Sequence, residues 1–284
     1  AYEISTRDWS SDVCSSDLCW SSASRKAVLP IVEERNALLF FPVQYEGNES
    51  SRNVVYGGQV PNQQLLPAID WLASAAGGTR KRVFLVGSDY VYPRTTNLIA
   101  RRWFADKGID VVGEEYFPLE NEDFAPVARR IVDSGADCVL NTVNGSGNVH
   151  LFTALKGAGI DPAKVPVVST SLSEDELRSI PRGLTDGHWL LSSYFQTVDR
   201  PANREWMAGF RAEFGRDRVF GDAMDSAWCL IHLWKAAVER AGSFATDALR
   251  QAFADGLAFD GPGGPVRLDP ATDRKSTRLN SSHE

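Results

Sequence analysis

The sequence is poor in cysteine and methionine, with 4 and 2 among its 284 residues. No two cysteines form a CxxC pair, so the sequence contains neither a zinc pattern nor an obvious disulfide framework. GxSxG and HExxH motifs are also missing. His150, His188 and His232 fall in different predicted elements and share no spacing. We therefore predict no catalytic residues, no metal site and no cofactor, which argues against an enzyme.

Long hydrophobic runs and a strong charge of one sign are also absent. No stretch of eighteen apolar residues occurs, so no membrane-spanning helix is predicted. The chain has 30 basic and 37 acidic residues, a formal net charge of −7. This mild acidity argues against nucleic acid or an anionic membrane as the partner.

Two polar segments flank the chain, Asp8–Leu18 and Asp273–His283. One DNA duplex can code both segments, one from each strand, and that DNA resembles a sequencing-library adapter. The alternative is that both are Ser-rich tails. We expect residues 1–18 and 273–284 to be non-native and outside the fold. The native segment is then 19–272, a fragment open at both ends.

Strand-like and helix-like segments alternate along this native segment. The apolar run 81–87 is typical of a buried strand, and an amphipathic helix is predicted after it, ended by Gly108. Such alternation indicates parallel sheets with helices on both faces, in which ligands bind beyond the carboxyl ends of the strands. The loops expected at those ends are Ser21–Ser24, Gln44–Tyr45, Ser88–Tyr90, Asn141–Gly147 and Ser169–Ser173.

Several residues in and near these loops are candidate helix caps. Ser88 or Asp89 is predicted to cap the helix after the 81–87 strand, and Ser173 to form a capping box with Glu176. Asp222 is a candidate N-cap of a long helix in which Asp225 lies one turn further on. At that position Asp225 either favours the helix dipole or faces a ligand.

Long motifs of the chain resemble the substrate-binding protein of urea ABC transporters, which is related to the amide-sensing regulator of amidase operons. The similarity covers essentially all of 19–272. Its motifs are CWSSASRKAVLP, FPVQYEGNESSRNVVYGGQVPNQQLLPAIDWL, GSDYVYPRTTN, NTVNGSGN and FDGPGGPVRLDP. The resemblance implies a type I periplasmic-binding fold, an α/β fold of two doubly wound parallel-sheet lobes joined by crossover strands. Lobe I would comprise 19–59 and 196–272, with its first strands missing, and lobe II would comprise 60–195.

The resemblance also implies a function. The protein would be the solute-binding component of an ABC importer, binding urea or a short amide in the cleft between two lobes. Its partners would be the permease subunits, and its location would be periplasmic or lipid-anchored and extracytoplasmic. The alternatives are a cytoplasmic short-amide sensor that controls an amidase operon and, third, an α/β enzyme. The positions implied to face the cleft are Trp20, Ser22, Gln44, Tyr45, Tyr90, Asn144 and Asp225.

Urea has one good acceptor oxygen and four N–H donors, and burying it is costly unless each group is paired. Asp225, Gln44 and tyrosine oxygens could accept from the N–H groups. Ser22 and Asn144 could donate to the oxygen, and the ring of Trp20 or Tyr45 could cover the planar face. The chain departs from the family at Ser21, where Thr is usual, at Phe41, and at Asp225, where a longer Glu is usual.

Overall fold

The computed structural model describes residues 19–269 and the backbone of 274–277. The chain divides into two compact units, which we call unit 1 (1–59 and 193–284) and unit 2 (60–192). The first division lies after Gln59, as the sequence analysis placed it, and the second lies before Ser193 rather than at 195/196. Each unit is described by itself below.

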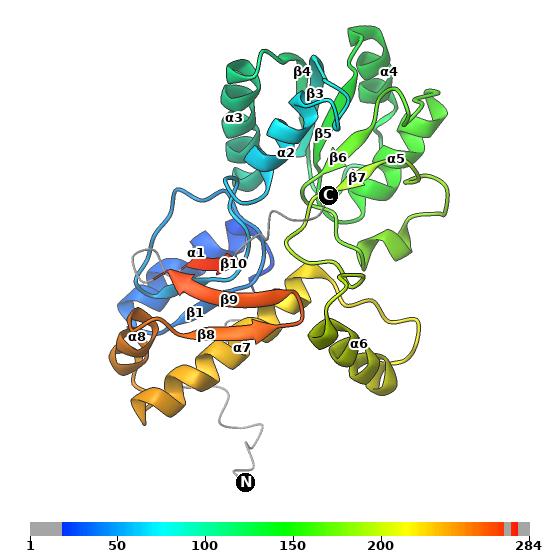
Figure 1. The fold of residues 1–284 in the computed structure, drawn as a ribbon. Coiled ribbons are helices and arrows are strands. Elements are labelled where there is room, and N and C mark those ends of the chain that lie inside the picture. The colour runs from blue at the N-terminus through cyan, green and yellow to red at the C-terminus, as the bar shows by residue number, and fades with distance from the viewer. Residues whose placement is uncertain (1–18, 270–273, 278–284) are drawn as a thin grey trace. The chain divides into compact units, whose positions relative to one another are not determined.

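Unit 2 is a parallel sheet with helices, in which strands and helices alternate along the chain (Figure 1). Its strands run in the order β4-β3-β5-β6-β7, and every neighbouring pair is parallel. Its elements are α2 (Leu65–Ala73), β3 (Arg82–Ser88), α3 (Val91–Asp106), β4 (Asp110–Phe117), α4 (Ala125–Ser134), β5 (Cys138–Thr142), α5 (Gly147–Gly157), β6 (Val167–Ser169), the 3₁₀ helix η3 (Glu176–Ser179) and β7 (Trp189–Leu190).

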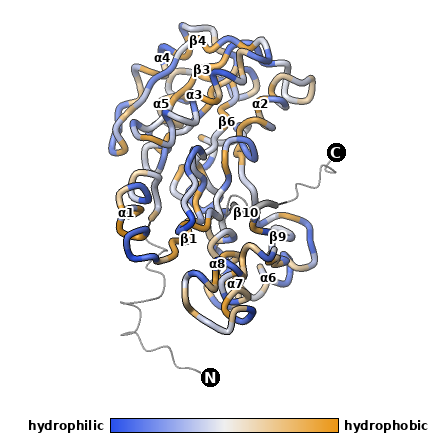
Figure 2. Tube along the Cα trace, turned by 90° about the vertical axis from the view of Figure 1, so that its left-hand side faces the viewer, coloured by the Kyte–Doolittle hydropathy of each residue, from blue (hydrophilic) through white to orange (hydrophobic). Residues whose placement is uncertain are grey.

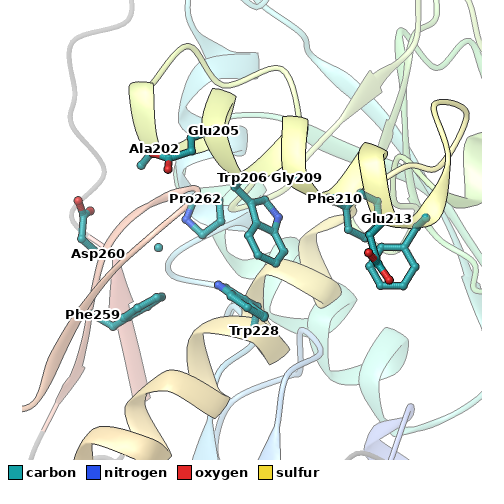
Figure 3. Close-up of a pocket in the computed structure, with 12 residues that line it drawn as sticks. Ala202, Glu205, Trp206, Gly209, Phe210, Glu213, Trp228, Phe259, Asp260 and Pro262 are labelled. Carbon is teal, nitrogen blue, oxygen red and sulfur yellow. The ribbon is translucent and has the colours of Figure 1, made fainter.

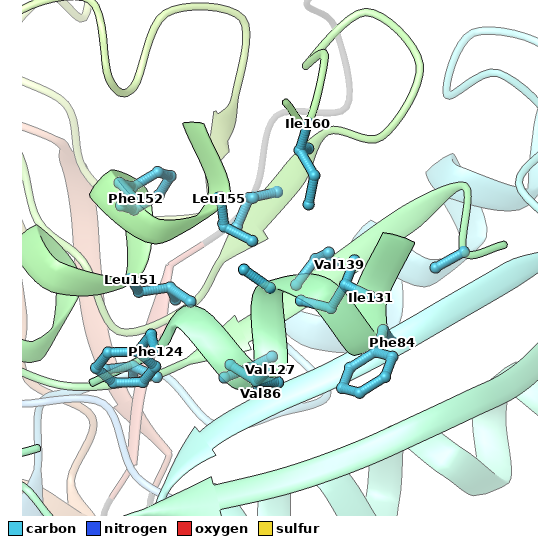
Figure 4. Packing of buried hydrophobic residues seen from close by; sticks show 14 of the residues in the cluster. Phe84, Val86, Phe124, Val127, Ile131, Val139, Leu151, Phe152, Leu155 and Ile160 are labelled. Atoms are coloured by element: carbon cyan, nitrogen blue, oxygen red, sulfur yellow. The ribbon is translucent and has the colours of Figure 1, made fainter. Parts of the chain in front are cut away.

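The strand β3 shows why this sheet is buried on both faces. Its side chains alternate, so Phe84 and Val86 join one hydrophobic cluster and Val83 and Leu85 join another. The first cluster packs against α4 and α5 (Figure 4). The second packs against α2 and α3. A continuous apolar run is what a parallel strand covered on both sides requires, so the predicted α/β class is confirmed.

Unit 1 has a mixed sheet, in the order β1-β2-β10-β9-β8. The pairs β1/β2 and β2/β10 are parallel, whereas β10/β9 and β9/β8 are antiparallel. Its elements are α1 (Ser22–Glu34), β1 (Leu39–Phe41), β2 (Val54–Tyr56), α6 (Pro201–Phe214), α7 (Asp222–Ala241), α8 (Thr246–Ala254), β8 (Ala258–Gly261), β9 (Gly264–Asp269) and β10 (Arg274–Thr277).

The core of unit 1 is formed by α7 and α8 against the sheet. Leu230 and Leu233 of α7 and Phe253 of α8 cluster with residues of β1, β2 and β9. In β9, Val266 and Leu268 are buried and their neighbours are exposed, which is the pattern of a sheet with one solvated face. Hydrophobic and hydrophilic residues follow one another along the helices of both units, as Figure 2 shows.

The sequence analysis did not predict several elements. The helices α1 and α8 and the β8–β9 hairpin were not expected, and β7 is only two residues long where a longer strand was predicted. The backbone of Arg274–Thr277 forms β10 beside β9, although 273–284 was expected to lie outside the fold. Short strands, and a hairpin that turns at Pro262 and Gly263, contain too few residues for a hydrophobic period to be recognised. The sequence therefore does not predict them.

The predicted helix caps need correction. The N-cap of α3 is Tyr90, because Ser88 is the last residue of β3 and Asp89 follows it directly. The N-cap of α7 is Gly221, and Asp222 is the first helical residue. In η3 the N-cap is Asp175, but one half of the predicted capping box is present, since the Ser173 N–H donates to Glu176 Oε2 at 2.9 Å. Each predicted cap lies one or two residues from the observed one, within the usual uncertainty of helix ends.

Two structural findings concern membrane-spanning helices and metal sites. Among the described residues, no helix is both long and apolar enough to cross a membrane. The same residues contain no group of three or more side chains that could hold a metal ion. Cys19, Cys138 and Cys229 are buried, and no disulfide joins these described cysteines.

Candidate ligand-binding site

The candidate residues of unit 1 lie around the carboxyl ends of β1 and β2 and the N-termini of α1 and α7. Ser21 caps α1: its hydroxyl accepts from the Ser24 N–H at 3.1 Å, and Ser24 bonds back to the Ser21 N–H. Immediately before the cap, Trp20 is 60% exposed. Ser22 is buried, and its hydroxyl accepts from the Arg25 Nη1 at 3.1 Å.

Arg25 is fully buried and is the centre of an ionic network that the sequence analysis missed. Its Nη2 donates to Glu46 Oε1 at 3.0 Å and its Nε donates to Glu49 Oε1 at 2.7 Å. Lys26 Nζ also lies 2.7 Å from Glu49 Oε2. Burial alone raises the pKa of Glu49, but hydrogen bonds from Arg25 and Lys26 lower it to about 2. A buried guanidinium is tolerated because these carboxylates neutralise it.

The Arg25 guanidinium also lies 4.8 Å from the Tyr45 ring centroid and 4.7 Å from that of Phe41. Tyr45 is fully buried and stacks on Tyr56 with ring centroids 4.7 Å apart and planes tilted by 14°. Its ring thus belongs to the core of unit 1. Of the two rings proposed to cover a planar ligand, the exposed Trp20 is the one in contact with solvent. Gln44 is half-buried in the loop after β1.

Two acids occupy the first turn of α7. Asp225 is 3% exposed and accepts from the Gly263 N–H at 3.4 Å. Asp222, which the sequence analysis treated only as a cap, accepts from Gln59 Nε2 at 3.0 Å and Ser193 Oγ at 2.5 Å. Gln59 and Ser193 are the residues at which the chain leaves and re-enters unit 1. Asp222 therefore joins these two segments to the start of α7.

In unit 2, Tyr90 and Asn144 lie at the carboxyl ends of two neighbouring strands, β3 and β5. The Asn144 N–H donates to Ser88 Oγ at 3.0 Å, and its Nδ2 donates to the Thr142 carbonyl at 3.1 Å. Both Tyr90 and Asn144 are half-buried. The two strands can approach here because Gly87 has no side chain: a Cβ would lie 2.5 Å from Thr142 Oγ1.

Behind this edge, unit 2 contains a buried network of neutral polar groups. Asn141 Nδ2 donates to Asn148 Oδ1 at 2.8 Å and to Ser169 Oγ at 3.0 Å. Asn148 Nδ2 in turn donates to the Val143 carbonyl at 3.0 Å. The loop after β5 is thus held by the side chains of Asn141 and Asn148.

One of the two histidines of unit 2, His188, has a structural role. His188 Nδ1 accepts from the Val167 N–H at 2.9 Å, and its ring lies 5.2 Å from that of Phe152. Burial, with a smaller contribution from Lys156, lowers the pKa of His188 to about 4. His188 is thus a neutral imidazole that accepts a backbone hydrogen bond within the fold.

The sequence matches the Periplasmic binding protein domain over residues 17–280, so the chain belongs to this family. Among curated relatives, the Leu/Ile/Val-binding protein homolog 6 of Brucella abortus (strain 2308) is 28% identical over 201 residues, which are 67% of this chain and 49% of the relative. The same values hold for the homologue from Brucella suis biovar 1 (strain 1330). The chain thus spans about half the length of the curated relatives it matches.

Solved structures share the fold at lower identity. The leucine-, isoleucine-, valine-, threonine- and alanine-binding protein of Brucella ovis, in a closed conformation, matches with a TM-score of 0.78 and 14% identity, covering 89% of this chain and 67% of that one. A solute-binding protein of an ABC transporter from Rhodopseudomonas palustris HaA2, in complex with p-hydroxybenzoic acid, matches with a TM-score of 0.78 and 21% identity, covering 91% and 71%. These likenesses establish the type I periplasmic-binding fold.

Proposed function

We propose that this protein is the solute-binding component of an ABC importer, and that it binds urea. Its family consists of binding proteins rather than enzymes, which supports the first part. The same membership implies an extracytoplasmic location and permease subunits as partners. The relatives are named for amino acids or were solved with p-hydroxybenzoic acid, so the choice of urea rests on the residues of this chain.

The observation that carries the choice of urea is the absence of an uncommitted cation near the described candidate residues. Arg25, Lys26 and Arg94 are the basic residues closest to them in sequence. Arg25 and Lys26 pair with Glu46 and Glu49, and Arg94 pairs with Asp89 at 2.6 Å. A carboxylate ligand is best bound by a free arginine or lysine, whereas a neutral ligand needs only hydrogen bonds.

In this proposal some polar candidate residues accept hydrogen bonds from the ligand and others donate to it. Asp225 and Gln44 accept from the N–H groups of urea, and Asn144 and Ser22 supply donors for its oxygen. Trp20 covers the planar face. Leaving a buried group such as Asp225 unpaired would cost about 1–3 kcal/mol, which gives selectivity against ligands that lack the matching group.

The test is calorimetric titration of the full-length protein with urea, acetamide, leucine and 4-hydroxybenzoate. The best small ligands gain about −1.5 kcal/mol per heavy atom, so the four heavy atoms of urea allow a dissociation constant on the order of tens of micromolar. We expect acetamide to bind more weakly, because its methyl group leaves acceptors such as Asp225 unpaired.

The same titration separates the alternatives. Tighter binding of acetamide than of urea would favour a short-amide sensor. Binding of leucine or 4-hydroxybenzoate alone would contradict the proposed ligand and would place the protein with the amino-acid and aromatic-acid binders among its structural neighbours.

A further inference from the structure

Unit 1 contains a groove that none of the candidate ligand-binding residues lines. It has a volume of about 570 Å³ and lies between α6, the start of α7 and the β8–β9 hairpin (Figure 3). Small-molecule sites have volumes of about 300–1,000 Å³, so the groove is large enough for a ligand well beyond the size of urea.

The sequence of α6 produces one wall of this groove. Residues four apart share a helix face, so two stripes lie side by side: Glu205, Gly209 and Glu213 in one, and Trp206, Phe210 and Phe214 in the other. Gly209 leaves a notch between the two carboxylates, since a Cβ at this position would meet nothing within 4 Å. Glycine inside a helix costs about 1 kcal/mol relative to alanine, and here it leaves open space.

The opposite wall is formed by Trp228 of α7 and by the hairpin residues Phe259 and Pro262. Figure 3 shows Trp206 extending from α6 toward Trp228, and their ring centroids are 4.1 Å apart. Arg200 fixes the hairpin, because its Nη1 donates to the Gly261 carbonyl at 3.2 Å. The aromatic side chains that line the groove are therefore held by contacts with one another and by the hairpin that Arg200 fixes.

The charge of the groove is negative. Three carboxylates line it, those of Glu205, Glu213 and Asp260, and its lining includes no lysine, arginine or histidine. Asp260 is compensated by Arg200 at 3.0 Å. Glu205 and Glu213 form no ion pair within the described part of the chain. Two uncompensated carboxylates thus border a wall of indole and phenyl rings.

We propose that this groove binds an organic cation, an ammonium or guanidinium group attached to an aromatic or alkyl body. Aromatic faces attract such cations through their quadrupoles, most strongly for tryptophan. Glu205 and Glu213 add Coulombic attraction, and the phenyl rings receive the apolar body. The same carboxylates repel aromatic acids. This site is separate from the proposed urea site and goes beyond the proposed function.

Three probes with the same ring but different charge test the proposal: benzyltrimethylammonium, benzyl alcohol and benzoate. The readout is the indole N–H signals of Trp206 and Trp228 in NMR spectra of the full-length protein, assigned with Trp→Phe variants. We expect the cation to shift both signals and to saturate them, the alcohol to bind at least about tenfold more weakly, and benzoate to give no saturable shift.

Variants locate the binding. In Gly209→Leu the added Cβ meets no atom within 4 Å, and leucine has a higher helix propensity than glycine. The new side chain should occupy the notch and abolish the shifts. Ala208→Leu is the matched control, since Ala208 is exposed on the same helix and does not line the groove. The double variant Glu205→Gln and Glu213→Gln keeps the size and shape of both side chains but removes their charges. It should weaken binding about tenfold. It also serves as the test if Gly209→Leu does not fold.

Three results would overturn the proposal: no saturable shift with the cation, equal affinity for the alcohol, or binding that Gly209→Leu and the double glutamine variant leave unchanged. Because urea is not among the probes, the outcome is independent of the ligand proposed for the other site.

Discussion

Buried charged side chains hold the strand-end loops of unit 1, whereas amides and hydroxyls hold the loop after β5 in unit 2. In unit 1, Arg25 is buried between Glu46 and Glu49, and Asp222 joins Gln59 to Ser193. In unit 2 the corresponding network is built from Asn141, Asn148 and Ser169. The two units therefore build the same kind of strand edge with different chemistry.

This difference predicts different responses to damage. Removing one member of a buried ionic network leaves the opposite charge without compensation, which is more costly than losing a neutral hydrogen bond. A charged network also responds to acid, whereas amides and hydroxyls do not titrate. The predictions below test whether the two units differ in these ways.

The largest effect is expected in unit 1 from Arg25→Met, which leaves Glu46 and Glu49 with the half-exposed Lys26 as their one remaining cation in this network. We expect unit 1 to lose about 3–5 kcal/mol of unfolding free energy. Hydrogen exchange read separately over the peptides of each unit would measure it. Adding Glu46→Gln and Glu49→Gln to this variant should restore most of the lost unfolding free energy. If it does not, the loss results from packing rather than from charge.

A smaller effect is expected on binding from Asp225→Ala in α7. If Asp225 accepts from the ligand, calorimetry should show a loss of about 1–3 kcal/mol in binding free energy. Asp247→Ala is the matched control, because Asp247 is an exposed acid in the first turn of another helix of unit 1, α8. An unchanged affinity for Asp225→Ala would leave this acid with a helix-terminal role only.

In unit 2, Asn148→Ala should cost about 1–2 kcal/mol of unfolding free energy, since Asn141 and the Val143 carbonyl each lose a partner. Hydrogen exchange of the loop after β5 would measure this change. The loss should be the same at pH 7 and at pH 4.5, because no titrating group belongs to this network. A loss that depends strongly on pH in this range would contradict the contrast between the units.

The smallest effects concern acid, and they fall in different pH ranges. The pKa of Glu49 is about 2 in the fold against an ordinary 4.5, so its contribution is complete above about pH 4.5 and is lost as the pH falls toward 2. The pKa of His188 is about 4 against 6.5. The unfolded chain therefore takes up this proton first, and unit 2 loses stability as the pH falls from about 6.5 to 4.

Because both groups are only partly buried, we expect about 1 kcal/mol from each. Hydrogen exchange of each unit at pH 7, 5 and 3 would separate the two ranges. His188→Gln keeps an acceptor for the Val167 N–H but does not titrate, so it should remove the loss above pH 4 in unit 2 and leave unit 1 unchanged. Equal losses in the variant and the parent would assign the effect to other groups.

The sequence alone determined the alternating architecture of unit 2. The strand β3 is a continuous apolar run and α3 follows it with a helical period, and such long patterns specify an element without help from distant residues. The loops at the strand ends could also be located, since parallel strands place their carboxyl ends on one edge. Tyr90 and Asn144 lie in loops located in this way, and the family resemblance singled out these two residues.

Only the tertiary structure decided which of these side chains are buried and with whom they pair. Arg25 lies in the run Ser-Arg-Lys, which reads as a solvated surface, and its burial depends on Glu46 and Glu49, which lie 21 and 24 residues away. Asp222 reads as a helix cap, yet it bonds Gln59 across 163 residues. Local patterns carry no information about such partners, because the free energy of a buried charge is set by groups that only the fold brings within hydrogen-bonding distance.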